Sequence, residues 1–207
     1  MAVSSVAAFW AIAAVLVAVP GPDWAFVLSS GVRSPTVVPA VGGIVLGYAG
    51  ITVVVAAGVG ALVARSPAAL ATMTIVGGLY LMWHGARTFS RDSAPSAAAH
   101  PVAAGRTPWE TLARGMGVSA LNPKGLLLFL ALLPQFTDAH GDWPLPVQLA
   151  LLGLVFMLTC AIFYLCLGSL ARSILRARPV AARLIARLSG AAMAAVGALL
   201  LIDRFIT

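Results

Sequence analysis

The sequence predicts an all-α integral membrane protein with six transmembrane helices, arranged as two inverted repeats of three helices. Of its 207 residues, 61% are hydrophobic and only 9% are charged, and the mean hydropathy is +1.01. A soluble domain carries about 25% charged residues, so this chain lacks the polar surface that a soluble helical bundle needs. Its apolar stretches are long enough, at about 1.5 Å per residue, to cross a hydrocarbon core of about 30 Å.

The predicted transmembrane segments are residues 4–31, 38–63, 68–88, 111–136, 146–171 and 185–203. The first and fourth are longer than a span requires and contain prolines, which fits a helix that is broken, tilted or re-entrant. Because each half has three spans, the second half must enter from the opposite side, as in the inverted repeats of carriers. We therefore expect residues 1–90 and 109–207 to be two repeats of one transmembrane domain. The low-complexity, proline-containing residues 91–108 are expected to be a flexible connector.

The arginines predict the orientation in the membrane. If all six segments cross, one side collects Arg33, Arg87, Arg91, Arg106, Arg114, Arg172, Arg176, Arg178, Arg183 and Arg187. The other side has Arg65 and Arg204, with Asp138 and Asp142 in its loop. Because loops rich in Lys and Arg stay in the cytoplasm, both termini are expected to face outward from the inner (plasma) membrane.

The net charge of +7 does not indicate a nucleic-acid partner. The basic residues lie between apolar segments, without the basic face interleaved with aromatic residues that reads nucleic acid. Most of the five tryptophans fall near segment ends, where interfacial anchoring explains them. Trp24 is also a candidate to stack on a solute, because it follows Asp23 directly.

Two proline motifs interrupt the first and fourth segments: Pro20-Gly21-Pro22-Asp23 and Asn122-Pro123-Lys124. Each places a helix breaker and an ionisable group where a spanning helix tolerates neither well. A membrane protein that breaks its helices at matching places in two halves typically holds a polar solute there. The motifs therefore predict a carrier.

Asp23 and Lys124 are the main candidates for binding that solute. The Asp23 carboxylate can bind a substrate amine or exchange a proton, although capping the helix after Pro22 would also explain it. Lys124 lies about a dozen residues, or roughly 18 Å, from either end of its segment, which is too far for its side chain to reach the interface. It therefore needs a counter-charge, a polar cavity or a helix carbonyl end, and Asn122 beside it can donate and accept hydrogen bonds. The pair would suit a zwitterion, and a purely structural ion pair remains the alternative.

Gln135 and Tyr80 are weaker candidates, for which surface or packing roles are equally open. No histidine has the spacing of metal ligands, so no metal is expected. The chain has no Ser-His-Asp signature, P-loop or nucleotide motif, so we expect neither a cofactor nor an enzyme.

Several motifs follow one another along the chain, among them Val19-Pro20-Gly21-Pro22, then Gly31-Val32-Arg33, then Ala120-Leu121-Asn122-Pro123-Lys124-Gly125, and then Leu133-Pro134-Gln135-Phe136. In these motifs and their order, the chain resembles the LysE/RhtB family of amino acid exporters. The spacing of the last two is the most specific. In the first cytoplasmic loop, Ser34-Pro35-Thr36 departs from the small residues and glycine that usually follow Arg33 in the family.

The resemblance implies an inner-membrane exporter of amino acids or their derivatives, coupled to the proton gradient as an antiporter, in a six-helix bundle that can dimerise. Our hypothesis is alternating access. Asn122, Lys124 and the backbone near Pro123 would hold the substrate carboxylate. Asp23 and the carbonyls freed by Pro20 and Pro22 would hold the amine, or Asp23 would be the site of proton coupling.

Three other functions remain open. An exporter of another solute, a cation or a small metabolite, would usually line its path with several carboxylates, whereas this chain offers essentially Asp23. A transmembrane thiol-electron carrier needs a reactive cysteine in each half, but Cys160 and Cys166 both lie in the fifth segment. An intramembrane lipid-phosphate enzyme needs acid, base and phosphate-binding residues at mid-membrane, whereas the arginines here lie mostly in loops.

Overall fold

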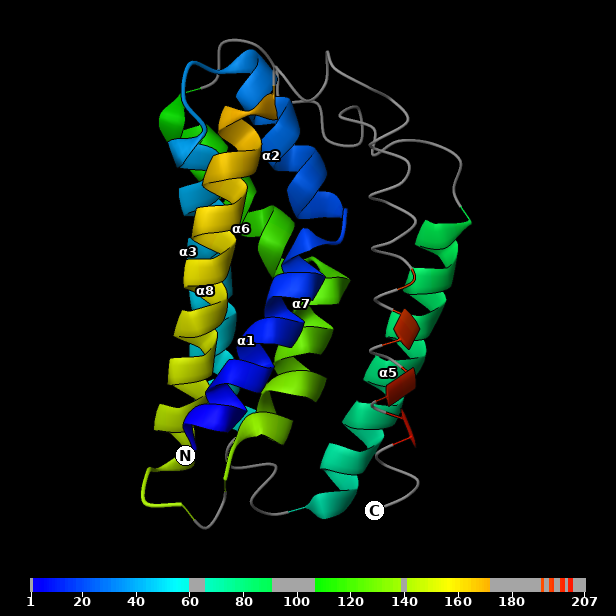
Figure 1. The fold of residues 1–207 in the computed structure, drawn as a ribbon. Coiled ribbons are helices and arrows are strands. Elements are labelled where there is room, and N and C mark those ends of the chain that lie inside the picture. Colours follow the sequence, from blue (N-terminus) through cyan, green and yellow to red (C-terminus); the bar gives the residue numbers. More distant parts are fainter. Residues whose placement is uncertain are drawn as a thin grey trace.

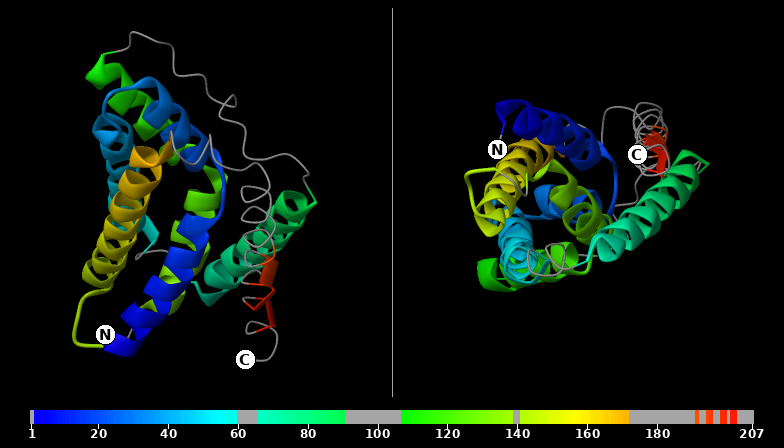
Figure 2. Two further views of the ribbon diagram at one scale, coloured as in Figure 1. Left: turned by 45° about the horizontal axis from the view of Figure 1, so that its top comes forward. Right: turned by 90° about the horizontal axis from the view of Figure 1, so that it is seen from below.

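The described part of the chain is built of helices. The computed structural model describes residues 2–59, 66–90, 107–138 and 141–171, together with a few positions between 191 and 202. Most of the helices pack lengthwise into a bundle, and α5 (Pro67–Phe89) stands to one side of it (Figures 1 and 2). The prediction of an all-α membrane protein is confirmed at this level.

The remaining helices follow in chain order. Before α5 come α1 (Val3–Ala18), α2 (Pro22–Arg33), α3 (Val38–Val54) and the π-helical turn η1 (Val55–Val59). After α5 come α6 (Pro108–Ala120), α7 (Pro123–Leu127), the π-helical η2 (Leu128–Leu132), the 3-10 helix η3 (Leu133–Phe136) and α8 (Leu145–Ser169). The predicted third segment corresponds to α5. The predicted sixth segment, 185–203, lies almost entirely outside the described residues, as does most of the predicted connector.

Within the described residues, two unbroken helices are long and apolar enough to cross a membrane: Val38–Gly58 and Leu145–Ser169. Two bent pairs pass the same test together. Val3–Ala18 and Pro22–Val32 meet at 59°, and Pro108–Ala120 and Lys124–Phe136 meet at 53°. If each bent pair is one span, the described residues hold four. Figure 1 shows α1 and α2 following one another along the bundle, with α2 and α6 at one end and α1 and α7 toward the other.

Prolines set where these helices begin. Pro22, Pro67, Pro108 and Pro123 each occupy the first position of a helix, where the missing N–H costs no hydrogen bond. At the start of α6 the Thr107 hydroxyl accepts from the Glu110 N–H, and the Thr107 N–H donates to the Glu110 carboxylate, both at 3.2 Å. This capping box ends the connector at α6.

Glycines allow α3 and α6 to pack backbone against backbone. A Cβ on Gly43 would collide with the Leu112 carbonyl of α6, and one on Gly115 would lie 2.7 Å from the Ala40 carbonyl of α3. Small residues give this close approach in membrane bundles, where van der Waals packing replaces the hydrophobic driving force. The contact joins the first half of the chain to the second.

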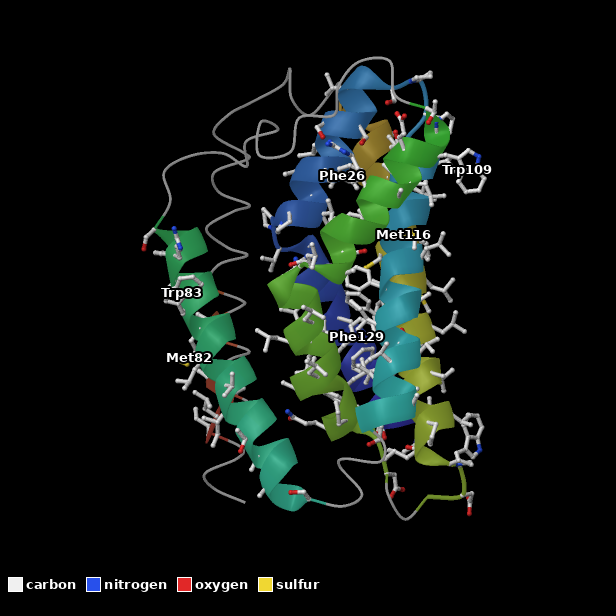
Figure 3. The ribbon with its side chains drawn as sticks, turned by 180° about the vertical axis from the view of Figure 1, so that it is seen from behind. Phe26, Met82, Trp83, Trp109, Met116 and Phe129 are labelled. Carbon is white, nitrogen blue, oxygen red and sulfur yellow. The ribbon has the colours of Figure 1, made fainter. Side chains whose placement is uncertain are left out.

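Aromatic rings fill the centre of the bundle. The Tyr48 ring stacks on Phe129 with centroids 5.7 Å apart and meets Phe156 edge-on at 4.9 Å. Phe129 lies inside the bundle, whereas Trp83 and Trp109 point outward (Figure 3). Four of the five tryptophans are about half exposed or more, as interfacial anchors would be, and Trp24 is the buried exception.

Candidate functional site

The first helix break leaves carbonyl oxygens at the end of α1 without their usual partners. Val19 has an extended backbone, and Pro20 has no N–H to give to the Leu16 carbonyl. The carbonyl of Val17 accepts instead from the indole N–H of Trp24 at 2.9 Å. This bond turns Trp24 inward and explains why it is buried. Trp24 therefore caps the C-terminal end of α1, and, unlike the four exposed tryptophans, it is not placed as an interfacial anchor.

The second break is closed by Asn122. The side-chain Oδ1 of Asn122 accepts from the backbone N–H of Lys124 at 3.1 Å, which makes Asn122 the N-cap of α7. Pro123 occupies the first position of that helix. The motif Asn122-Pro123-Lys124 therefore ends α6 and starts α7, and it aims the Lys124 side chain at the other half of the chain.

Lys124 reaches the end of α1. Its Nζ donates to the carbonyl of Leu16 at 3.1 Å and to that of Val19 at 3.0 Å, and the residue is only 4% exposed. The C-terminal end of a helix carries partial negative charge, which favours a cation. Of the environments predicted for this lysine, the helix carbonyl end is the one that the structure shows.

Asp23 occupies the first turn of α2, where the helix dipole favours an anion. One carboxylate oxygen, Oδ2, accepts from the Tyr48 hydroxyl of α3 at 2.6 Å and lies 3.4 Å from the Tyr164 hydroxyl of α8. The other oxygen, Oδ1, is buried and has no hydrogen-bond partner. A buried carboxylate oxygen without a donor is costly, so this atom marks a place where a ligand or a proton would be stabilised.

Asp23 and Lys124 form no direct salt bridge with each other, because the tyrosine hydroxyls bind the carboxylate and the carbonyls of α1 bind the ammonium. Asn122 links the two breaks, because its Nδ2 lies 3.4 Å from the Tyr48 hydroxyl that binds Asp23. The structure thus brings together the three polar residues of the two motifs. The prolines and the glycine of those motifs (Pro20, Gly21, Pro22 and Pro123) form the two breaks around them.

The other candidates lie apart from this cluster or outside the description. Gln135 is on η3, and its Nε2 donates to the Ala131 carbonyl of its own helical run at 2.6 Å. Tyr80 is on α5 and Arg33 is the last residue of α2, and the side chains of both lie outside the described part.

Sequence reasoning missed Tyr48 and Tyr164. The chain has three tyrosines, and these two lie inside the unbroken helices α3 and α8. A hydroxyl in the middle of an apolar segment was the available signal, because it needs a partner in the membrane. Gly125 belongs with them, since a Cβ there would lie 2.5 Å from the Tyr48 ring and 2.8 Å from its hydroxyl.

The cysteines and acidic residues indicate no redox or metal centre in the described part. Cys160 is fully buried near the charged pair and Cys166 is exposed, and both lie on α8. In that part of the chain, no three His, Cys, Asp or Glu residues gather in a way that could hold a metal ion.

A groove of about 470 Å³ lies between α2 and α6, beside the charged pair. Its apolar lining is Pro22, Phe26, Gly117, Val118 and Leu121, and its polar lining is Arg114 and Asn122. Phe26 lies on the α2 side of this half of the bundle (Figure 3). Two of the lining residues, Pro22 and Asn122, belong to the breaks themselves, so the groove adjoins the buried cluster.

Comparison with known proteins gives a family-level match. The model of the family described as LysE type translocator matches residues 14–204. A leucine efflux protein of Klebsiella pneumoniae is 29% identical over 136 residues, which cover 62% of this chain and 61% of that protein. A leucine efflux protein of Enterobacter sp. is 32% identical over 61% of this chain and 60% of its own length. The uncharacterized membrane protein YrhP of Bacillus subtilis is 27% identical over 78% of this chain and 80% of its own.

The chain spans about three fifths of the length of the two leucine efflux proteins it matches. No solved structure matches it significantly.

Proposed function

Because the chain belongs to the LysE type translocator family, we propose that it exports small amino acids or their derivatives from the cytoplasm. Membership makes it a multi-pass membrane transporter and not an enzyme. The proposal that the substrate is an amino acid rests on the buried residues Asp23 and Lys124, which place one charge of each sign at the two helix breaks. A free amino acid carries the same two charges, on an ammonium and a carboxylate group attached to one carbon atom. The names of the leucine efflux relatives support an amino acid, and leucine is the first to test.

We propose six membrane-crossing helices in two inverted repeats. The two bent pairs support this arrangement, because their bends are similar and each break is followed by a proline and then a charged residue. An inverted repeat would bring both breaks to the same depth, where carriers bind their solutes. The arginine distribution would place the α2 and α6 end in the cytoplasm of a cell whose plasma membrane holds the protein.

The substrate carboxylate would bind Lys124 and Asn122. In the structure the ammonium of Lys124 is held by the Leu16 and Val19 carbonyls. A carboxylate would compete with these carbonyls for the ammonium, and the substrate amine would replace the lysine at the end of α1 or bind the free Oδ1 of Asp23. Binding a zwitterion would therefore loosen the contact that Lys124 makes between the two halves. Such a release supports alternating access, because one half must move against the other.

Proton coupling would follow from competition at Asp23. Its Oδ1 is the one carboxylate oxygen in the cluster without a donor, and either a substrate amine or a proton would supply one. If the two exclude each other, protons entering from outside would exchange for amino acid leaving the cell, which makes the protein an antiporter. The groove, Asp23 and Lys124 all lie within one chain, so the protomer would be the transporting unit even within a homodimer.

Counterflow in proteoliposomes tests the proposal. Vesicles loaded with unlabelled neutral, basic or acidic amino acids are given the labelled form outside, and uptake is measured with and without a pH gradient. We expect saturable exchange of one class, and its loss in Lys124→Ala. The matched control is Arg87→Ala, which removes an exposed cation that lies over the Trp83 ring on α5, away from the cluster. No exchange of any amino acid by folded protein would overturn the proposal.

A further inference from the structure

We propose that the groove between α2 and α6 receives the side chain of the transported amino acid, and that Gly117 sets the size it accepts. This inference rests on the proposed function, which concerns only the charged groups of the substrate. It adds a substrate class, amino acids with an apolar side chain, and a residue that determines specificity.

The groove begins where the charged cluster ends. Asn122 lines the groove and also contacts the Tyr48 hydroxyl that binds Asp23. Pro22 lines it too and precedes Asp23 directly. A substrate whose amine and carboxylate are held by Asp23 and Lys124 would therefore have its side chain beside the groove. The volume of about 470 Å³ is within the usual range for small-molecule pockets, about 300–1,000 Å³.

The lining favours an apolar side chain over a charged one. Phe26, Val118 and Leu121 provide hydrocarbon surface, and no acidic residue lines the groove to pair with a basic substrate. The cation Arg114 lies on α6, seven positions before the C-cap Leu121, or about 10 Å along the helix axis. It marks the far end of the groove and would repel lysine or arginine there.

Gly117 is open to the groove, unlike its neighbour on α6. Outside its chain neighbours and the adjoining backbone of α6, a Cβ on Gly117 would have no atom within 4 Å, whereas a Cβ on Gly115 would strike the backbone of α3. Gly115 thus packs α6 against α3, and Gly117 leaves space on another face. A larger side chain at 117 would fill the groove without disturbing the helix contact.

The test compares Gly117→Leu with Gly50→Leu in counterflow assays of alanine, leucine and phenylalanine. Gly50 on α3 is equally open, with nothing within 4 Å, but does not line the groove. We expect wild type and Gly50→Leu to exchange leucine and phenylalanine well. In Gly117→Leu the ratio of leucine to alanine exchange should fall by about 10- to 100-fold, because filling an apolar pocket discriminates by this much per group. Thermal unfolding in detergent checks that both variants fold.

Each outcome decides between the two proposals. An unchanged ratio in Gly117→Leu, or an equal loss of both exchanges, would overturn the side-chain subsite and leave the exporter proposal standing. If the wild type exchanged only basic or acidic amino acids, the side-chain subsite would again be overturned and the exporter proposal would stand. Absence of any amino acid exchange by the wild type would overturn the proposed function itself.

Discussion

The two helix breaks differ in what they do for the buried charges. The first break, between α1 and α2, offers two facing helix ends: the carbonyl end of α1 and the amino end of α2. Asp23 lies at the amino end, and the ammonium of Lys124 lies at the carbonyl end, so both charges are stabilised by one break. The second break, between α6 and α7, provides the lysine and its cap Asn122 but receives no charge from the first half.

This asymmetry shows that similar motifs in two halves need not make two similar sites. Lys124 is near the start of α7, where the local helix end disfavours a cation. Its ammonium is stabilised instead by reaching across to the Leu16 and Val19 carbonyls at the end of α1. In the proposed mechanism, the first break would be the binding place and the second would supply the partner that moves. The following experiments test this difference between the two breaks.

The largest effect is expected from Lys124→Met. The change leaves Asp23 buried without a positive charge and removes the ammonium that donates to the Leu16 and Val19 carbonyls. Breaking a buried pair in this way typically costs about 3–5 kcal/mol. We expect a clear drop in the thermal unfolding temperature in detergent and loss of counterflow.

The double variant Asp23→Asn/Lys124→Met separates stability from transport. With both charges removed, no uncompensated buried charge remains, so much of the stability should return while transport stays absent. A Lys124→Met protein as stable as wild type would show that the first break does not depend on the lysine, and the comparison between the breaks would fail.

A smaller loss of stability is expected from Asp23→Asn. The amide keeps an oxygen for the Tyr48 hydroxyl, and Lys124 keeps its two carbonyl acceptors. The cost should be that of weakening one hydrogen-bonded group, about 1–3 kcal/mol. Any exchange that remains should no longer respond to an imposed pH gradient. Asp138→Asn, which changes an exposed residue before α8, is the control and should keep the wild-type response.

The sequence predicted the helical membrane fold and the two breaks because prolines and apolar length act locally. Pro22 and Pro123 start helices at the positions expected. It also predicted that Lys124 needs a partner, because a lysine at mid-segment cannot reach water. Which partner it finds depends on tertiary packing, and the carbonyl end of α1 lies more than one hundred residues away in the chain. The groove was not predictable, because its lining residues come from half-helices in the two different halves of the chain.

The tyrosines show the same limit from the other side. Tyr48 and Tyr164 lie on helices that lack any break, so pattern reasoning gave them no role. Their convergence on one oxygen of Asp23 depends on how α3 and α8 pack around α2. The local sequence was therefore enough to identify Asp23 and Lys124 as candidates. Their hydrogen-bond partners are set by how the helices pack.

An intermediate effect is expected from Gly125→Ala, which tests whether the second break holds Tyr48 in place. The added methyl group would lie 2.5 Å from the tyrosine ring, so the ring must shift, and its hydroxyl is the group that donates to Asp23. Overpacking of this kind costs about 1–3 kcal/mol, and transport should fall with it. Gly50→Ala, in open space on α3, should change neither. If Gly125→Ala transports normally while Tyr48→Phe does not, the glycine does not act through the tyrosine.

The smallest effect is expected from Trp24→Phe, which distinguishes the two caps of α1. Trp24 and Lys124 both donate to carbonyls at this helix end, but Trp24 belongs to the same half of the chain as α1 and carries no charge. A hydrogen bond inside a membrane bundle contributes about 0.6 kcal/mol on average. The phenylalanine ring can keep part of the contact with Phe163, so the unfolding temperature should fall only slightly. Counterflow should persist, whereas it is lost in Lys124→Met. Equal loss of transport in both variants would mean that the end of α1 must simply be capped. If Trp24→Phe keeps transport and Lys124→Met loses it, transport requires that one donor at the end of α1 be a charged group that can be released.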